Sequence, residues 1–202
     1  APSVSRDGTR VVFTMRTSAE AGHRVWLLEL ATRQARQLTF EPEPLPGGRV
    51  ANDRDPTFGP EDTIWYASTR AGAVADQGQL LDAELYALEL ASGDTRRFTY
   101  TPHIERRPVF FDLGDEAGGE VGFSVLRDAI PGQARAHVFR FPPSQRTEYH
   151  QHFGVTPRET FFYDMRELPD GRYASVVGEL PARLEAGALG FIEGKSGPEI
   201  NA

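Results

Sequence analysis

Two neighbouring stretches decide the fold: residues 55–70 read DPTFGPEDTIWYASTR, and residues 84–99 read ELYALELASGDTRRFT. Apolar and polar residues alternate within each run, which is typical of strands that bury one face. Gly, Pro, Asp and Ser gather at the connections, where tight turns need them. Together the stretches predict four short antiparallel strands in about 45 residues.

The same order of strands and turns occurs about four times along the chain. Phe13 aligns with Tyr66, Arg16 aligns with Arg70, and residues 37–39 align with residues 97–99. The approximate units are residues 1–45, 51–101, 105–153 and 157–202, and the last strand of the fourth unit is missing or barely begun. A period of this length is typical of propellers and solenoids.

The repeat predicts an all-β fold, a β-propeller of four-stranded antiparallel blades with about four blades present. Propeller blades stack around a channel, and rings usually close with four to eight blades. We therefore expect residues 1–202 to be an incomplete part of a larger propeller. Residues 71–82 form a long insertion, and such loops often carry recognition.

Composition excludes several functions. The net charge is −7, with 22 Lys and Arg interspersed among 29 Asp and Glu, so nucleic acid is not an expected partner. There is no cysteine, which excludes disulfides, thiolate metal sites and thioether-linked haem within these residues. The apolar runs are far shorter than the roughly 20 residues of a membrane helix, so this segment predicts no membrane span.

One cluster of possible metal ligands stands out. Glu148, His150 and His152 alternate along one predicted strand, which would place three ligands on the same face. Polar residues at a strand end that face water explain the same pattern, and a tetrahedral site needs a fourth ligand. The cluster is the candidate metal site of this sequence.

Arginines recur at one position of the blades, at Arg16, Arg70 and Arg127, beside Ser68 and Ser124. The planar donor fork of arginine favours a structural role, in which it ties a carboxylate or carbonyl of the neighbouring blade. An anion-lined channel is the alternative.

A search for catalytic motifs finds none. The sequence has no Gly-x-Ser-x-Gly elbow, no phosphate-binding glycine loop and no His-Glu-x-x-His. Asp7-Gly8 and Asp170-Gly171 are predicted hairpin turns, because glycine supplies a positive φ there. The sequence thus assigns no catalytic residue and no cofactor, and it favours a role other than catalysis.

The units resemble the WD40-like (PD40) repeats of TolB-type propellers. The resemblance rests on Asp7-Gly8, residues 37–39, residues 68–70 and residues 84–86, and it covers most of residues 1–112. Residues 148–199 resemble the propeller-forming middle domain of hydrazine synthase alpha subunits, through residues 152–154, 162–166, 168–172 and 186–190. The haem motif Cys-x-x-Cys-His is missing from the sequence, so this resemblance implies no haem site.

The resemblance implies an exported protein, periplasmic or extracellular, that docks into a multi-subunit complex. The leading hypothesis is a non-catalytic propeller that mediates protein–protein interaction or scaffolding, with a membrane-bound partner left open. The alternative is the propeller domain of a larger enzyme, a prolyl-oligopeptidase-like hydrolase or a multihaem oxidoreductase, whose catalytic part lies outside this chain. A third hypothesis is a small ligand or metal at the channel mouth.

Overall fold

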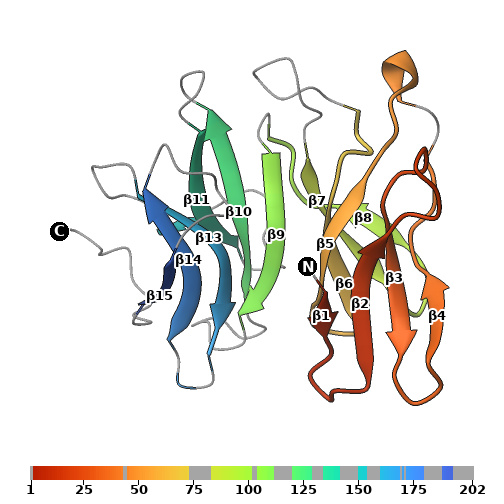
Figure 1. The fold of residues 1–202 in the computed structure, drawn as a ribbon, viewed down its shortest axis with the longest axis horizontal. Helices are drawn as coiled ribbons and strands as arrows, with labels where there is room; N and C mark the ends of the chain where they lie inside the picture. Colours follow the sequence, from red (N-terminus) through yellow and green to blue (C-terminus); the bar gives the residue numbers. More distant parts are fainter. Residues whose placement is uncertain are drawn as a thin grey trace. The chain divides into compact units, whose positions relative to one another are not determined.

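The protein is an all-β chain of antiparallel sheets that follow one another along the sequence (Figure 1). The computed structural model describes residues 2–42, 45–72, 83–101, 104–111, 120–128, 134–141, 150–153, 160–168, 170, 172–179 and 188–192. Most of the insertion at residues 71–82 lies outside these ranges. The chain divides into two compact units, Ala1–Pro108 and Val109–Ala202.

The first two sheets each have four strands in sequence order, the arrangement of a propeller blade. Blade 1 contains β1 (Ser3–Val4), β2 (Arg10–Met15), β3 (Arg24–Glu29) and β4 (Gln34–Gln37). Blade 2 contains β5 (Asp53–Phe58), β6 (Thr63–Ser68), β7 (Glu84–Glu89) and β8 (Thr95–Arg97). A short 3-10 turn, η1 (Pro46–Gly48), lies between them.

The remaining strands form two more sheets. The third contains β9 (Ile104–Phe111), β10 (Glu120–Asp128), β11 (Ala134–Phe141) and β12 (His150–Phe153). The fourth contains β13 (Thr160–Glu167), β14 (Tyr173–Glu179) and β15 (Ala188–Ile192), three strands within the described residues. The predicted all-β fold of four-stranded antiparallel blades is confirmed. The blade boundaries and the incompleteness of the ring stay predictions.

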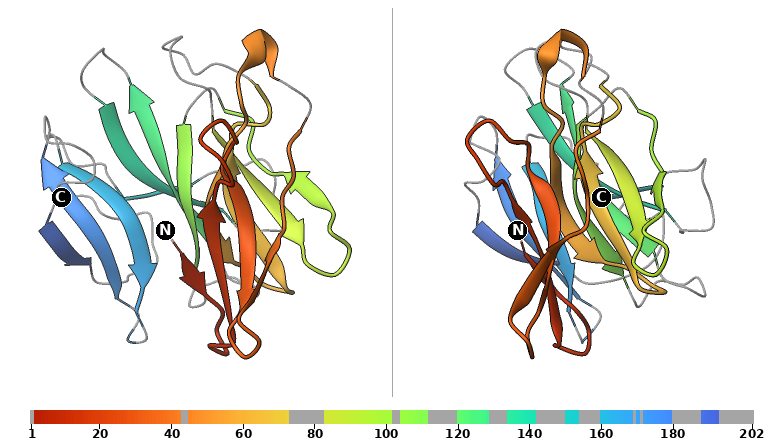
Figure 2. Two further views of the ribbon diagram at one scale, coloured as in Figure 1. Left: turned by 45° about the vertical axis from the view of Figure 1, so that its right-hand side comes forward. Right: turned by 90° about the vertical axis from the view of Figure 1, so that its right-hand side faces the viewer.

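The strands of blades 1 and 2 lie next to each other in the ribbon (Figure 2). One apolar core is shared by the two blades. Its buried members come from β2, β3 and the end of blade 1 on one side and from β6 and β7 on the other: Val12, Val25, Leu27, Leu38, Ile64, Tyr66, Tyr86 and Leu88. The rings of Tyr66 and Tyr86 stack with centroids 5.9 Å apart. Along β2 and β3 the core positions alternate with less buried ones, so the alternation in the sequence accounts for the packed face of blade 1. In blade 2, β6 and β7 are buried on both faces, which the alternation does not predict.

The second unit has a smaller described core. Val109, Phe111, Met165 and Tyr173 are buried together, and the rings of Phe111 and Tyr173 meet edge to face at 5.1 Å. Gly122 lies against Phe111 so closely that a Cβ at this position would overlap the ring. A glycine on β10 is therefore required by packing.

Several blades carry a left-handed residue in the innermost strand. Asp55, Arg107 and Asp164 have φ of 53°, 52° and 54°. Register shifts between Arg54 and Thr57 and between Tyr163 and Arg166 enclose two of them, so each is the extra residue of a β-bulge. The bulges bend the innermost strands, and the plain alternation read from the sequence did not predict them.

Candidate functional site

The predicted metal ligands fall mainly outside what the structure describes. Glu148 lies outside the described residues, and His150 and His152 lie on β12, where only the backbone is described. The pairing of β11 with β12 shifts register at this point, since Phe139 faces Gln151 while Val138 faces Phe153. His152 is thus the extra residue of the strand, and strict alternation is interrupted there. The metal site stays a prediction; among the residues whose side chains are described, no group of three or more ligands gathers.

A buried ion pair organises the first strand of blade 2. The carboxylate of Asp53 is fully buried; its Oδ1 accepts a hydrogen bond from the Ser68 hydroxyl at 2.5 Å, and its Oδ2 accepts one from Arg70 Nη2 at 2.8 Å. The Arg70 guanidinium also lies over the rings of Tyr66 and Tyr86, 5.5 and 5.3 Å from their centroids. The buried charges are stable here because the Asp53 carboxylate is paired with the Arg70 guanidinium, which in turn contacts two aromatic rings.

Arg24 connects blade 1 to the chain entering blade 2. Its Nη1 donates to the Ala51 carbonyl at 2.8 Å and lies 3.9 Å from Asp53 Oδ2, and its guanidinium pairs with Glu41. Only 6% of the side chain is exposed, and this burial lowers the pKa of Arg24 from its usual value. Gly22 leaves room for the contact, since a Cβ there would overlap the Ala51 oxygen. Arg24 is thus one of the residues that reach from blade 1 to blade 2.

The three arginines highlighted by the repeat do not share one environment. Arg70 binds a carboxylate of its own blade, whereas Arg16 is exposed and donates to the Ala19 carbonyl at 3.5 Å. Strand register explains the difference: Arg24 faces Met15 in blade 1, and the equivalent Glu84 faces Ser68 in blade 2, so the alignment of Arg16 with Arg70 is wrong by one residue. The side chain of Arg127 lies outside the described residues.

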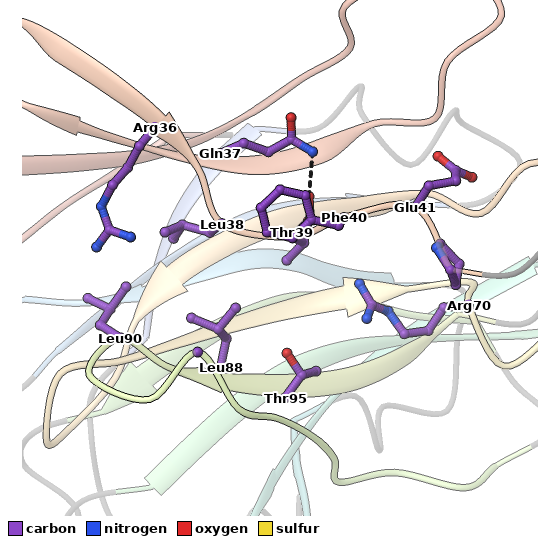
Figure 3. A pocket seen from close by; sticks show the side chains of 12 residues that line it. Arg36, Gln37, Leu38, Thr39, Phe40, Glu41, Arg70, Leu88, Leu90 and Thr95 are labelled. Carbon is purple, nitrogen blue, oxygen red and sulfur yellow. Dashed lines mark hydrogen bonds between the residues drawn. The ribbon is translucent and has the colours of Figure 1, made fainter.

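A groove of about 460 Å³ lies between the end of blade 1 and the β7–β8 hairpin of blade 2 (Figure 3). It is lined by Arg36, Gln37, Leu38, Thr39, Phe40, Glu41, Pro42, Arg70, Leu88, Leu90, Gly93 and Thr95. In Figure 3, Arg36 and Arg70 lie on opposite sides of the view, with Leu38 and Leu88 between them. The lining combines two arginines and other polar side chains with three leucines, so the groove is a candidate binding site of mixed polar and apolar character.

An exposed aromatic residue follows the outermost strand of both blades. The Thr39 hydroxyl accepts the backbone N–H of Val25 at 3.0 Å, and the equivalent Thr99 hydroxyl accepts that of Leu85 at 2.8 Å. Two residues before each threonine, a side chain donates to the backbone carbonyl of that threonine: Gln37 to Thr39 at 2.7 Å and Arg97 to Thr99 at 2.9 Å. These bonds fix the next residues, Phe40 and Tyr100, which are 67% and 69% exposed.

The sequence did not identify this aromatic pair, although a signal for it was present. Phe40 and Tyr100 directly follow residues 37–39 and 97–99, which the repeat had aligned. Their exposure could not be read from the pattern, because an aromatic residue at the end of a strand is more often buried.

A second polar cluster lies where β5 and β9 begin. Asp55 accepts a hydrogen bond from Arg106 Nε at 2.6 Å, and Arg54 Nη2 lies 3.3 Å from Nδ1 of His23. Burial and the positive charge of Arg106 lower the pKa of Arg54. Asp55 keeps a lowered pKa, since Arg106 outweighs the effect of burial. Through the pair of Asp55 and Arg106, the cluster joins the innermost strands β5 and β9.

No protein-family model matches the chain, and no curated protein matches its sequence. Solved structures do match. A putative TolB from Agrobacterium tumefaciens is 14% identical with a TM-score of 0.63, over 94% of this chain and 63% of that one. TolB from Acinetobacter baumannii is 16% identical with a TM-score of 0.55, over 89% of this chain and 40% of that one. Hydrazine synthase from Kuenenia stuttgartiensis is 14% identical with a TM-score of 0.57, over 83% of this chain and 28% of that one.

These matches confirm the TolB-like propeller resemblance at the level of fold. The chain spans 40% and 63% of the two TolB structures, less than two thirds of each. A search for membrane-spanning helices, limited to the described ranges, finds none of sufficient length and apolar character.

Proposed function

We propose that this chain is a protein-docking propeller domain and that it works within an exported multi-subunit assembly. The observation that carries the proposal is the pair Phe40 and Tyr100, large aromatic side chains that the same hydrogen bonds hold outward on two successive blades. Exposed aromatic groups on a rigid scaffold are favoured at protein interfaces, where they bury a large area at little cost in entropy.

Site-specific photocrosslinking in the native host tests this function. A photoreactive phenylalanine analogue replaces Phe40 or Tyr100 in the full-length protein, and the control places it at Leu30, which is 42% exposed in the β3–β4 hairpin. We expect positions 40 and 100 to crosslink to the same protein, while position 30 does not. Crosslinking from none of the three positions, or equally from all three, would contradict a docking role for the aromatic pair.

A second candidate is the propeller domain of a larger enzyme. The chain covers only 28% of the hydrazine synthase chain and 40% of TolB from Acinetobacter baumannii, so similar propeller folds occur within longer proteins. Sequencing the complete gene product distinguishes the candidates: a Gly-x-Ser-x-Gly segment supports a hydrolase, and Cys-x-x-Cys-His motifs support a multihaem oxidoreductase.

The proposed location is periplasmic or extracellular. It rests on the TolB-like resemblance, and the acidic net charge of −7 is compatible with it. Fractionation of native cells measures it directly, and recovery of the full-length protein only with the cytoplasmic fraction would contradict it.

A further inference from the structure

The groove between blades 1 and 2 is positively charged within an acidic protein. Arg36 is exposed and, within the described part of the chain, has no carboxylate within ion-pair distance. Glu41, the acidic group of the lining, is paired with Arg24. The net charge of the whole chain is −7, so a surplus of positive charge at a groove is a local feature and favours an acidic ligand.

The second cation of the groove is held in place before any ligand arrives. Arg70 is fixed by Asp53 at 2.8 Å and by two tyrosine rings, yet 19% of its side chain remains exposed. Its guanidinium has five N–H donors, and the pair with Asp53 uses only part of them. A guanidinium that is already oriented loses little entropy when it binds a further carboxylate.

The surface between the two cations is partly apolar, with leucines beside the polar side chains of Thr39 and Thr95. Leu38 and Leu88 are 7% and 3% exposed and lie between Arg36 and Arg70 in Figure 3, while Leu90 extends the apolar wall. A ligand that fits this order carries negative groups at both ends and an apolar side chain between them.

We propose that this groove binds an acidic peptide segment of a partner protein in extended form, with carboxylates at Arg36 and Arg70 and an apolar side chain against Leu38 and Leu88. The proposal rests on the protein-docking function and names the chemistry of the partner. A volume of about 460 Å³ accommodates a few side chains and not a folded surface, which favours an extended segment. The exposed ring of Phe40 at the rim continues the apolar surface beyond the groove.

Fluorescence polarisation with defined peptides tests the proposal. The probe is fluorescein-labelled Glu-Leu-Phe-Glu, and the comparison peptides are Lys-Leu-Phe-Lys, which reverses the charges, and Glu-Ser-Ser-Glu, which removes the apolar centre. We expect saturable binding of the acidic apolar peptide and weak or no binding of the other two. Because two ion pairs contribute, its affinity should fall as salt rises.

The deciding variant is Arg36→Glu, which reverses an exposed charge that no ion pair of the described residues uses. It should weaken the probe by about tenfold or more, since a like charge then faces the peptide. Arg6→Glu is the control for reversing a charge away from the groove, because Arg6 is exposed and lies outside the groove lining. Equal affinity for Arg36→Glu and Arg6→Glu, or equal binding of acidic and basic peptides, overturns the proposal.

The two proposals fail in different ways. If photocrosslinking at positions 40 and 100 persists in the Arg36→Glu background while the acidic peptide does not bind the native protein, the groove proposal fails and the docking function stands. If neither position crosslinks, the docking function itself fails.

Discussion

Replacing Asp53 by Asn should unfold the first unit more easily, because it removes the negative charge at the centre of a buried network. Asn keeps the shape and can still accept the Ser68 hydroxyl, but its amide N–H₂ then faces the Arg70 and Arg24 guanidinium groups. Breaking a buried ion pair from one side costs about 3–5 kcal/mol. Arg70 is 19% exposed and is partly hydrated when unpaired, so we expect the lower end, about 3 kcal/mol.

Tryptophan fluorescence during urea unfolding measures this change in the right part of the chain. The two tryptophans, Trp26 and Trp65, lie on β3 and β6, both in the first unit. With an m value of about 2 kcal/mol/M, a loss of 3 kcal/mol lowers the urea midpoint by about 1.5 M. The second unit has no tryptophan, so the fluorescence change reports on the unfolding of the first unit.

The control is an ion pair of similar length on the surface. Asp62 pairs with Arg10 at 2.7 Å, but the two side chains are 62% and 24% exposed. Asp62→Asn should cost less than about 1 kcal/mol, because solvent and salt screen such pairs. If Asp53→Asn and Asp62→Asn shift the midpoint equally, burial does not govern the strength of the Asp53 pair and the reasoning is refuted.

Two further predictions concern turns of the first unit. Arg33 has φ of 58° at the hairpin position where blade 2 has Gly93 with φ of 79°. Arg33→Gly should therefore stabilise the unit by about 0.5–1 kcal/mol, and Gly93→Arg should destabilise it by a similar amount. An unchanged urea midpoint in both variants would disprove this. Asp7 accepts hydrogen bonds from Ser5 and Thr9, which lower its pKa from 3.8 to about 2. The contribution of Asp7 to stability should therefore be present above the pKa of the unfolded chain and fade as the pH falls towards 2. An NMR titration that gives the Asp7 carboxyl a pKa near 4, with the same pKa in Thr9→Val, would contradict this.

The strand pattern and many of the turns follow from the sequence. Alternating apolar residues with turn-forming groups between them predicted the four-stranded blades, and Gly8 has the positive φ of 70° expected of a hairpin turn. Phe13 and Tyr66 occupy the same position, since they pair with Trp26 and Tyr86 on the next strand of their own blades. These features are local, so neighbouring residues are enough to specify them.

Register beyond the strand ends is decided by three-dimensional pairing. Arg16 lies three residues after Phe13, while Arg70 lies four residues after Tyr66, and a difference of one residue turns a side chain to the other face. A period of two does not state where pairing starts or stops, so such errors concentrate at strand ends.

The sequence by itself determined the repeated blade, because each strand and turn depends on residues a few positions apart. Only the tertiary structure decided which groups come together: Asp53 binds Arg70, Arg24 binds the Ala51 carbonyl, and Arg36 lines one groove with Leu88. Arg70 follows Asp53 by 17 positions and lies in the same blade, whereas the other two pairs are 27 and 52 positions apart and come together only when one blade packs against the next. The physical reason is that burial and charge pairing depend on the complete packed surface, which no local pattern contains.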